Sequence, residues 1–170
     1  IKAMPNLICA ILTISDTRTL QDDKSGDLLQ QFALADGHTV AERDLVRDDI
    51  YAIRAAVSNW IANTAINVVI TTGGTGFTGR DSTPEALMPL FDKQIEGFGE
   101  IFRQLSYEEI GTSTIQSRAV GGLANGTLIF SLPGSSGAVT TGWQKILHNQ
   151  LDINFRPCIF AELIPRFKER

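Results

Sequence analysis

Glycine and small hydroxyl residues are concentrated in three short stretches of this chain. They are Ser15-Asp16-Thr17, the run 73–81 that opens with Gly73-Gly74-Thr75-Gly76, and Pro133-Gly134-Ser135-Ser136-Gly137. Small residues let a ligand approach the backbone, and free backbone N–H groups bind anions. Any one stretch could be only a tight turn, but three at one edge of a sheet would indicate a ligand site.

The central stretch partly matches two phosphate-binding motifs. Residues 74–79 fit the dinucleotide pattern G-x-G-x-x-G, but the next helix is expected to begin only near Thr83, outside the motif. The same residues nearly fit a P-loop, with Arg80 where the motif has Lys and Asp81 where it has Ser or Thr. The loop is therefore predicted to bind phosphate without belonging to either class. Gly74 and Gly76 are predicted to need positive φ.

Carboxylates accompany these loops. Asp81 follows the glycines directly, Asp48 ends a different predicted strand, and Asp16 follows the first one. Asp81 could simply complement the dipole of the next helix. Alternatively, since a carboxylate beside phosphate repels it unless a cation lies between, Asp81 and Asp48 could hold magnesium, which binds one or two carboxylates together with phosphate oxygens.

Alternating strands and helices are expected to position the loops. The apolar runs 7–15 and 67–72 read as strands buried on both faces, and 39–46 as a strand nearer an edge. A helix is predicted from an N-cap at Ser25 to Gly37, and a second one after Asp48 and Asp49.

The second half continues this pattern. Helices are expected from Thr83 as N-cap, over 99–110 and over 138–147, and Asn125-Gly126 predicts a β-hairpin within 119–132. The last stretch, 151–170, carries no clear pattern and is interpreted as a C-terminal tail. The sequence thus predicts one α/β domain spanning 1–170, a three-layer α/β/α fold with a mostly parallel open sheet plus the hairpin.

Composition excludes several classes of function. The chain has 170 residues, a formal net charge of −4 and no dense basic stripe, so no nucleic-acid partner is expected. Two cysteines and two histidines, all isolated, predict neither a disulfide framework nor a histidine or cysteine metal site, and Cys9 is expected in the core. No run resembles a membrane span or a signal peptide, so we expect a cytoplasmic protein without a membrane partner.

Several motifs together carry a family resemblance. The main one is Val69-Ile70-Thr71-Thr72-Gly73-Gly74-Thr75-Gly76 followed by Arg80-Asp81-Ser82-Thr83-Pro84-Glu85-Ala86. Further matches are Ile14-Ser15-Asp16, Glu96-Gly97-Phe98-Gly99-Glu100, Gln116-Ser117-Arg118-Ala119 and Leu132-Pro133-Gly134. Together they cover about residues 7–137. This combination resembles the molybdopterin-binding family of molybdenum cofactor biosynthesis, which includes molybdopterin adenylyltransferase.

The resemblance implies a ligand and a reaction. The ligand is molybdopterin, a pterin with a dithiolene and a terminal phosphate, and the reaction transfers AMP from ATP onto that phosphate with magnesium. Asp48 and Asp81 match the family's two essential acids and would be both catalytic and magnesium-binding. The expected substrate-binding residues are Ser15, Asp16, Gly73, Gly74, Thr75, Gly76, Ser106, Ser117, Pro133, Gly134 and Ser135. For Ser106 and Ser117 a capping role fits nearly as well.

The same resemblance implies a homotrimer or homohexamer. The hairpin beside the weakly charged run 110–122 is the expected subunit contact, unless it packs on its own sheet. Two other functions stay open. One is a protein of the same pathway that binds molybdopterin without reacting it, and the other is a nucleotide-binding oxidoreductase.

Overall fold

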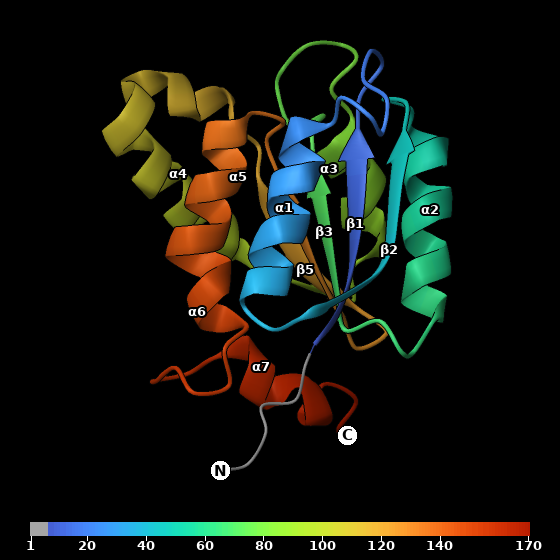
Figure 1. Cartoon of the computed structure of the whole chain (residues 1–170), viewed down its shortest axis with the longest axis vertical. Coiled ribbons are helices and arrows are strands. Elements are labelled where there is room, and N and C mark those ends of the chain that lie inside the picture. Colours follow the sequence, from blue (N-terminus) through green and yellow to red (C-terminus); the bar gives the residue numbers. More distant parts are fainter. Residues whose placement is uncertain (1–6) are drawn as a thin grey trace.

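The computed structural model describes residues 7–170. The fold is built on a six-stranded sheet (Figure 1). The strands are β1 Ile8–Ile14, β2 Thr39–Val46, β3 Val68–Thr72, β4 Lys93–Gln94, β5 Val120–Ala124 and β6 Thr127–Leu132. Their order is β2-β1-β3-β6-β5-β4. Strands β2, β1, β3 and β6 are parallel, while β5 runs antiparallel to β6 and β4 antiparallel to β5. The predicted fold, a mostly parallel sheet with a hairpin, is confirmed.

Helices cover both faces of this sheet. The long ones are α1 Lys24–Ala35, α2 Ile50–Ala62 and α4 Glu96–Ile110. Shorter ones are α3 Thr83–Leu87, η1 Met88–Leu90, η2 Gly111–Gln116, α5 Ser136–Gly142, the π-helical stretch η3 Trp143–Leu147, α6 His148–Gln150, α7 Phe160–Leu163 and η4 Ile164–Arg166. Helices α1, α4 and α5 lie on one face and α2 and α3 on the other, which gives three layers (Figure 1).

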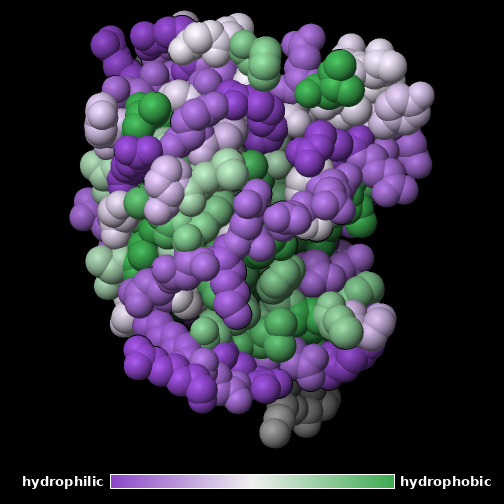
Figure 2. Space-filling model, turned by 180° about the vertical axis from the view of Figure 1, so that it is seen from behind, coloured by the Kyte–Doolittle hydropathy of each residue, from purple (hydrophilic) through white to green (hydrophobic). Residues whose placement is uncertain are grey.

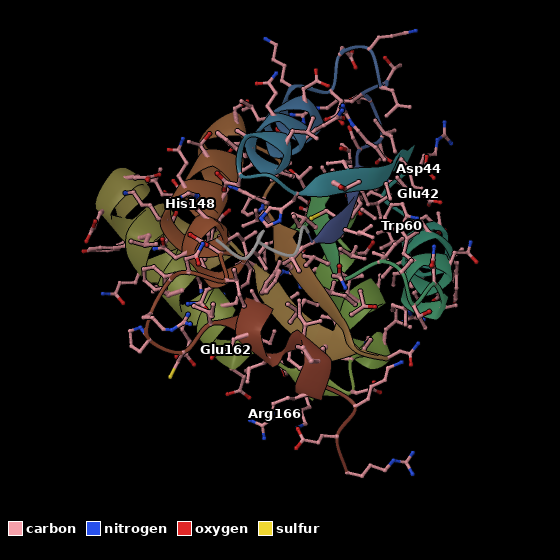
Figure 3. The ribbon with its side chains drawn as sticks, turned by 60° about the horizontal axis from the view of Figure 1, so that its bottom comes forward. Glu42, Asp44, Trp60, His148, Glu162 and Arg166 are labelled. Atoms are coloured by element: carbon pink, nitrogen blue, oxygen red, sulfur yellow. The ribbon has the colours of Figure 1, made fainter. Side chains whose placement is uncertain are left out.

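Side chains of the central strands alternate between two apolar clusters. Along β1, Cys9 and Ile11 pack with α1 and α5, whereas Ala10, Leu12 and Ile14 pack with α2 and α3. This is why the run has no polar alternation, since both faces are buried. Cys9 is a core residue as expected, and burial raises the pKa of its thiol to about 12. The indole N–H of Trp60 in α2 donates a hydrogen bond to the carboxylate of Glu42 in β2 (Figure 3).

Two helix starts differ from the sequence prediction. The N-cap of α1 is Asp23, whose carboxylate accepts from the N–H of Gly26, and not Ser25. The N-cap of α3 is Ser82, and not Thr83. In both places the predicted residue makes a tertiary hydrogen bond instead: Ser25 donates to Gly134, and Thr83 to Gly73. Gly37 does end α1 with a φ of 85°, as predicted.

The hairpin and the C-terminal segment are both integrated into the domain. Asn125 and Gly126 form the turn with φ of 49° and 77°, and β6 pairs along its length with β3. The hairpin therefore pairs within its own sheet, which is the second of the two possibilities that the sequence left open. In the segment 151–170, Leu151, Ile159 and Ala161 are buried in the same core cluster as residues of α1 and α4. No helix within residues 7–170 is long and apolar enough to cross a membrane.

Candidate functional site

The three loops predicted to meet do so at the carboxyl edge of the parallel strands, at the top of Figure 1. They surround a cavity of about 570 Å³, within the range typical of small-molecule sites. Its lining residues are Ile14, Ser15, Asp16, Thr17, Arg18, Asp48, Gly73, Gly74, Thr75, Gly76, Asp81, Gln116, Ser117, Pro133, Gly134 and Ser135. Every predicted site residue except Ser106 is among them. Ser106 lies buried on α4 and does not line this cavity.

The glycine loop has a fixed backbone conformation. Gly73 and Gly74 have φ of 105° and 70°, in the region that favours glycine. A Cβ on Gly73 would lie 2.1 Å from the carbonyl oxygen of Ile14, so the loop crosses directly over the end of β1. Thr83 closes the loop, with its N–H donating to the carbonyl of Gly74 (3.0 Å) and its hydroxyl to that of Gly73 (2.9 Å). Gly76, contrary to the prediction, is not a positive-φ residue.

Arg118 holds the far side of this loop. Its Nε donates to the carbonyl of Gly76 (2.8 Å), and its Nη2 donates to the carbonyl of Asp81 (3.1 Å). The guanidinium also lies over the ring of Phe77, 5.6 Å from the centroid, and forms an ion pair with Glu85. The sequence places Arg118 in a family motif, but its structural role is not visible there because it lies about forty residues from the loop.

The carboxylates come together from separate loops. Asp48 Oδ1 accepts from the N–H (3.3 Å) and the hydroxyl (3.1 Å) of Ser82, and the N–H of Asp48 donates to Asp16 Oδ1 (3.1 Å). Asp81 Oδ2 accepts from the N–H (2.9 Å) and the hydroxyl (2.8 Å) of Thr78. The loops that follow β1, β2 and β3 are thus joined through acidic side chains.

These carboxylates differ in their electrostatics. Burial raises the pKa of Asp48, and the charges of Asp81 and Asp16 raise it further, while the hydrogen bonds from Ser82 oppose the shift. The pKa of Asp16 is lowered by the hydrogen bond from Arg80, whose Nη2 lies 2.7 Å from Asp16 Oδ2, and by the N–H of Asp48. The ionised form of Asp48 is therefore less stable in the folded protein than in water.

Asp48 and Asp81 are the two carboxylates from the sequence prediction that could hold a magnesium ion. Magnesium binds through one or two carboxylates, with waters and ligand phosphates completing its shell. Within the part of the chain that the structure describes, no group of three or more His, Cys, Asp or Glu side chains could hold a metal ion. Asp48 and Asp81 could supply two carboxylates to a cation whose other ligands are phosphate oxygens and water.

Replacing Asp48 by Asn is expected to raise the melting temperature at pH 7–8. Because the folded-state pKa of Asp48 is raised, its contribution to stability is fully present below its unfolded pKa and is lost as pH rises through the folded pKa. Asn keeps an oxygen that accepts from Ser82 but carries no charge. Calorimetry between pH 4 and pH 8 should show the gap between variant and wild type growing with pH. A gap that is constant or shrinks with pH would contradict this electrostatic account.

The hydroxyl residues at the rim have mixed roles. Ser15 Oγ accepts from the N–H of Thr17 (3.2 Å) and of Arg18 (3.1 Å), and Ser135 Oγ caps α5 by accepting from Ala138. Ser117 faces the cavity, and its buried Oγ has no hydrogen-bond partner among residues 7–170. Arg18 and Gln116 also line the cavity, and the predicted set contains neither.

Comparison with known proteins identifies the family. Residues 10–152 match the family described as "Probable molybdopterin binding domain". The chain is 56% identical over 151 residues, 89% of each chain, to "Molybdenum cofactor biosynthesis protein B" of Escherichia coli K12, and 48% identical over 144 residues to the Bacillus cereus protein of that name, covering 84% of this chain and 85% of that one.

Solved structures agree with this match. "Crystal structure of Molybdenum cofactor biosynthesis protein B" superimposes with a TM-score of 0.85 at 46% identity, over 88% of this chain and 94% of that one. "Tungsten cofactor synthesizing protein MoaB from Pyrococcus furiosus" does so with a TM-score of 0.76 at 38% identity, over 85% and 92%. By its sequence and its fold, this chain belongs to the molybdopterin-binding family of molybdenum cofactor biosynthesis B proteins.

Proposed function

We propose that this protein acts in molybdenum cofactor biosynthesis by binding molybdopterin in the loop cavity and transferring AMP from ATP to its terminal phosphate. The observation that supports this most is that Asp48 and Asp81, from two separate loops, line the same cavity as the glycine loop. The family match and the names of the relatives support the pathway. The residues that line the cavity support the proposed transfer reaction.

The reaction needs positioning more than covalent assistance. An oxygen of the pterin phosphate attacks the α-phosphorus of ATP, the bond from that phosphorus to the β-phosphate oxygen breaks, and pyrophosphate leaves. Asp48 and Asp81 would hold magnesium, which when bound neutralises charge on the transferred phosphoryl group. The backbone of residues 73–76 would cradle phosphate, and fixed donors of this kind stabilise the transition state without reorganising.

Incubation with molybdopterin, ATP and magnesium tests the proposal. Mass spectrometry should detect molybdopterin carrying AMP, with release of pyrophosphate. Tight binding of molybdopterin without this product would favour the non-catalytic alternative. Tight binding of reduced nicotinamide dinucleotide would favour an oxidoreductase. The start of α3 at Thr83, outside the glycine motif, argues against an oxidoreductase because dinucleotide sites place pyrophosphate at a helix N-terminus within the motif.

We also propose that the protein assembles as a homotrimer or homohexamer. Exposed apolar side chains lie on α4 and η2, among them Ile101, Ile110 and Ile115, the last 78% exposed. Seen from behind, the surface shows hydrophobic side chains gathered among hydrophilic ones (Figure 2). Light scattering should give a mass of three or six times 18.5 kDa. A mass near 18.5 kDa that is stable on dilution would refute the oligomer.

A further inference from the structure

One side chain, Arg118, bridges the two ends of the segment that carries Asp81. This segment, residues 76–81, belongs to the loop that rises above the sheet between β3 and α3 (Figure 1). Arg118 Nε donates to the carbonyl of Gly76 at its start (2.8 Å), and Nη2 donates to the carbonyl of Asp81 at its end (3.1 Å). Residues 77–80 between these ends are exposed and belong to no helix or strand. The guanidinium therefore holds together the base of an exposed loop.

Arg118 is itself fixed in place by its surroundings. Its backbone N–H donates to the carbonyl of Thr75 (3.0 Å), and β5 begins two residues later at Val120. Its Nη1 pairs with the carboxylate of Glu85 on α3, and the ring of Phe77 lies 5.6 Å from the guanidinium carbon. Each of the three guanidinium nitrogens thus has a partner within the protein. Such a side chain holds the protein's own loop rather than offering its charge to a ligand.

Different side chains hold the two halves of the loop after β3. Thr83 holds the first half, since its hydroxyl and its N–H donate to the carbonyls of Gly73 and Gly74. Arg118 holds the second half, residues 76–81, by its two carbonyl contacts. Within that half, the N–H and the hydroxyl of Thr78 fix the carboxylate of Asp81. The backbone that would cradle phosphate and the carboxylate that would hold magnesium therefore depend on separate contacts.

We infer that Arg118 is a positioning residue that fixes the carboxylate of Asp81 for the metal ion of the transfer step. This inference rests on the proposed function. Without the bridge, residues 76–81 can shift toward solvent while Thr83 still holds Gly73 and Gly74. A shift on the ångström scale is costly at a reacting centre, and groups that orient metal ligands matter for metal affinity. Loss of Arg118 should therefore impair metal binding and AMP transfer more than it impairs molybdopterin binding.

The test compares Arg118→Gln and Arg118→Lys with the wild type in two assays. In AMP transfer with molybdopterin, ATP and magnesium, kcat of Arg118→Gln should fall at least about tenfold while KM for molybdopterin changes by less than about twofold. In a titration with manganese and pyrophosphate, followed by electron paramagnetic resonance, metal binding should weaken at least about tenfold, the scale of losing a group that orients a metal ligand. Lys keeps the charge but not the planar fork that bridges two carbonyls, so Arg118→Lys should resemble Arg118→Gln.

Arg103→Gln is the matched control. Arg103 also donates to a backbone carbonyl, that of Ala119 (3.3 Å), but makes no hydrogen bond to residues 73–81 of the described chain, so both assays should give wild-type values.

The outcomes separate the inference from the proposed function. A wild-type kcat in Arg118→Gln, a loss confined to KM, or full activity in Arg118→Lys would overturn the inference. If the wild type transfers no AMP but its manganese affinity depends on Arg118, the proposed function fails and the positioning role stands. A wild type that neither transfers AMP nor binds manganese would overturn both. Thermal unfolding checks that each variant is folded, and if Arg118→Gln is not, Arg118→Lys decides by the same measurements.

Discussion

Replacement of Asp81 by Asn is expected to lower the rate of AMP transfer to molybdopterin by at least about a hundredfold, the scale of losing one key electrostatic group at a reacting centre. Asn keeps an oxygen that can accept from the N–H and the hydroxyl of Thr78, so the loop should keep its shape. What disappears is the second negative charge beside Asp48. Molybdopterin binding should persist or tighten, because a carboxylate near phosphate is gone. Single-turnover kinetics and equilibrium titration measure the two effects separately.

The charge-matched control is Asp44→Asn. Asp44 is exposed on β2 (Figure 3) and lies outside the cavity, and its carboxylate accepts only from the N–H of the next residue, Leu45, among the hydrogen bonds of the described chain. Its replacement should leave both measurements unchanged. If Asp81→Asn transferred AMP at the wild-type rate, Asp81 would be reduced to a carboxylate that orders the loop and the start of α3.

The regular elements could be predicted because their signals are local. Both faces of β1 and β3 are buried, so their sequences are continuous apolar runs. Helix caps were less predictable, since Ser25 and Thr83 are good capping residues by type but are used for contacts with Gly134 and Gly73. The segment after Leu151 lacks a pattern because its helices, α7 and η4, are too short to show periodicity.

The meeting of the three loops at one cavity was predictable for a topological reason. Parallel strands bring their carboxyl ends to one edge, so loops far apart in sequence must meet. The cationic residues were not predictable in this way. Arg18 is one of several polar residues in its loop, and its place in the cavity wall goes with its hydrogen bond to Ser25, which only the packing shows. Ser106 was expected at the site because of its residue type, but it is buried on α4 and does not line the cavity.

The substitutions Gly73→Ala and Gly76→Ala, three residues apart in the glycine loop, should affect different properties: the first stability and the second activity. Gly73→Ala would force an L-residue to a φ of 105° and bring its Cβ to 2.1 Å from the backbone oxygen of Ile14, which cannot move without disturbing β1. We expect the melting temperature to fall by roughly 10 °C, as a loss of about 3–4 kcal/mol would produce in a chain of this size. Gly76→Ala meets the side chain of Asp81 instead, with Oδ2 at 2.6 Å, and that carboxylate can turn aside.

Gly76→Ala should therefore keep its melting temperature within about 2 °C, a small effect on stability for a chain of this size. It should lose at least about tenfold in AMP transfer, because the carboxylate of Asp81 is displaced from its place beside Thr78 and misplacement on the ångström scale is costly at a reacting centre. Differential scanning calorimetry and the transfer assay on both variants separate the two residues. Equal losses of stability in the two variants would show that the whole loop is a structural turn. A fully active Gly76→Ala would show that the orientation of Asp81 does not limit the reaction.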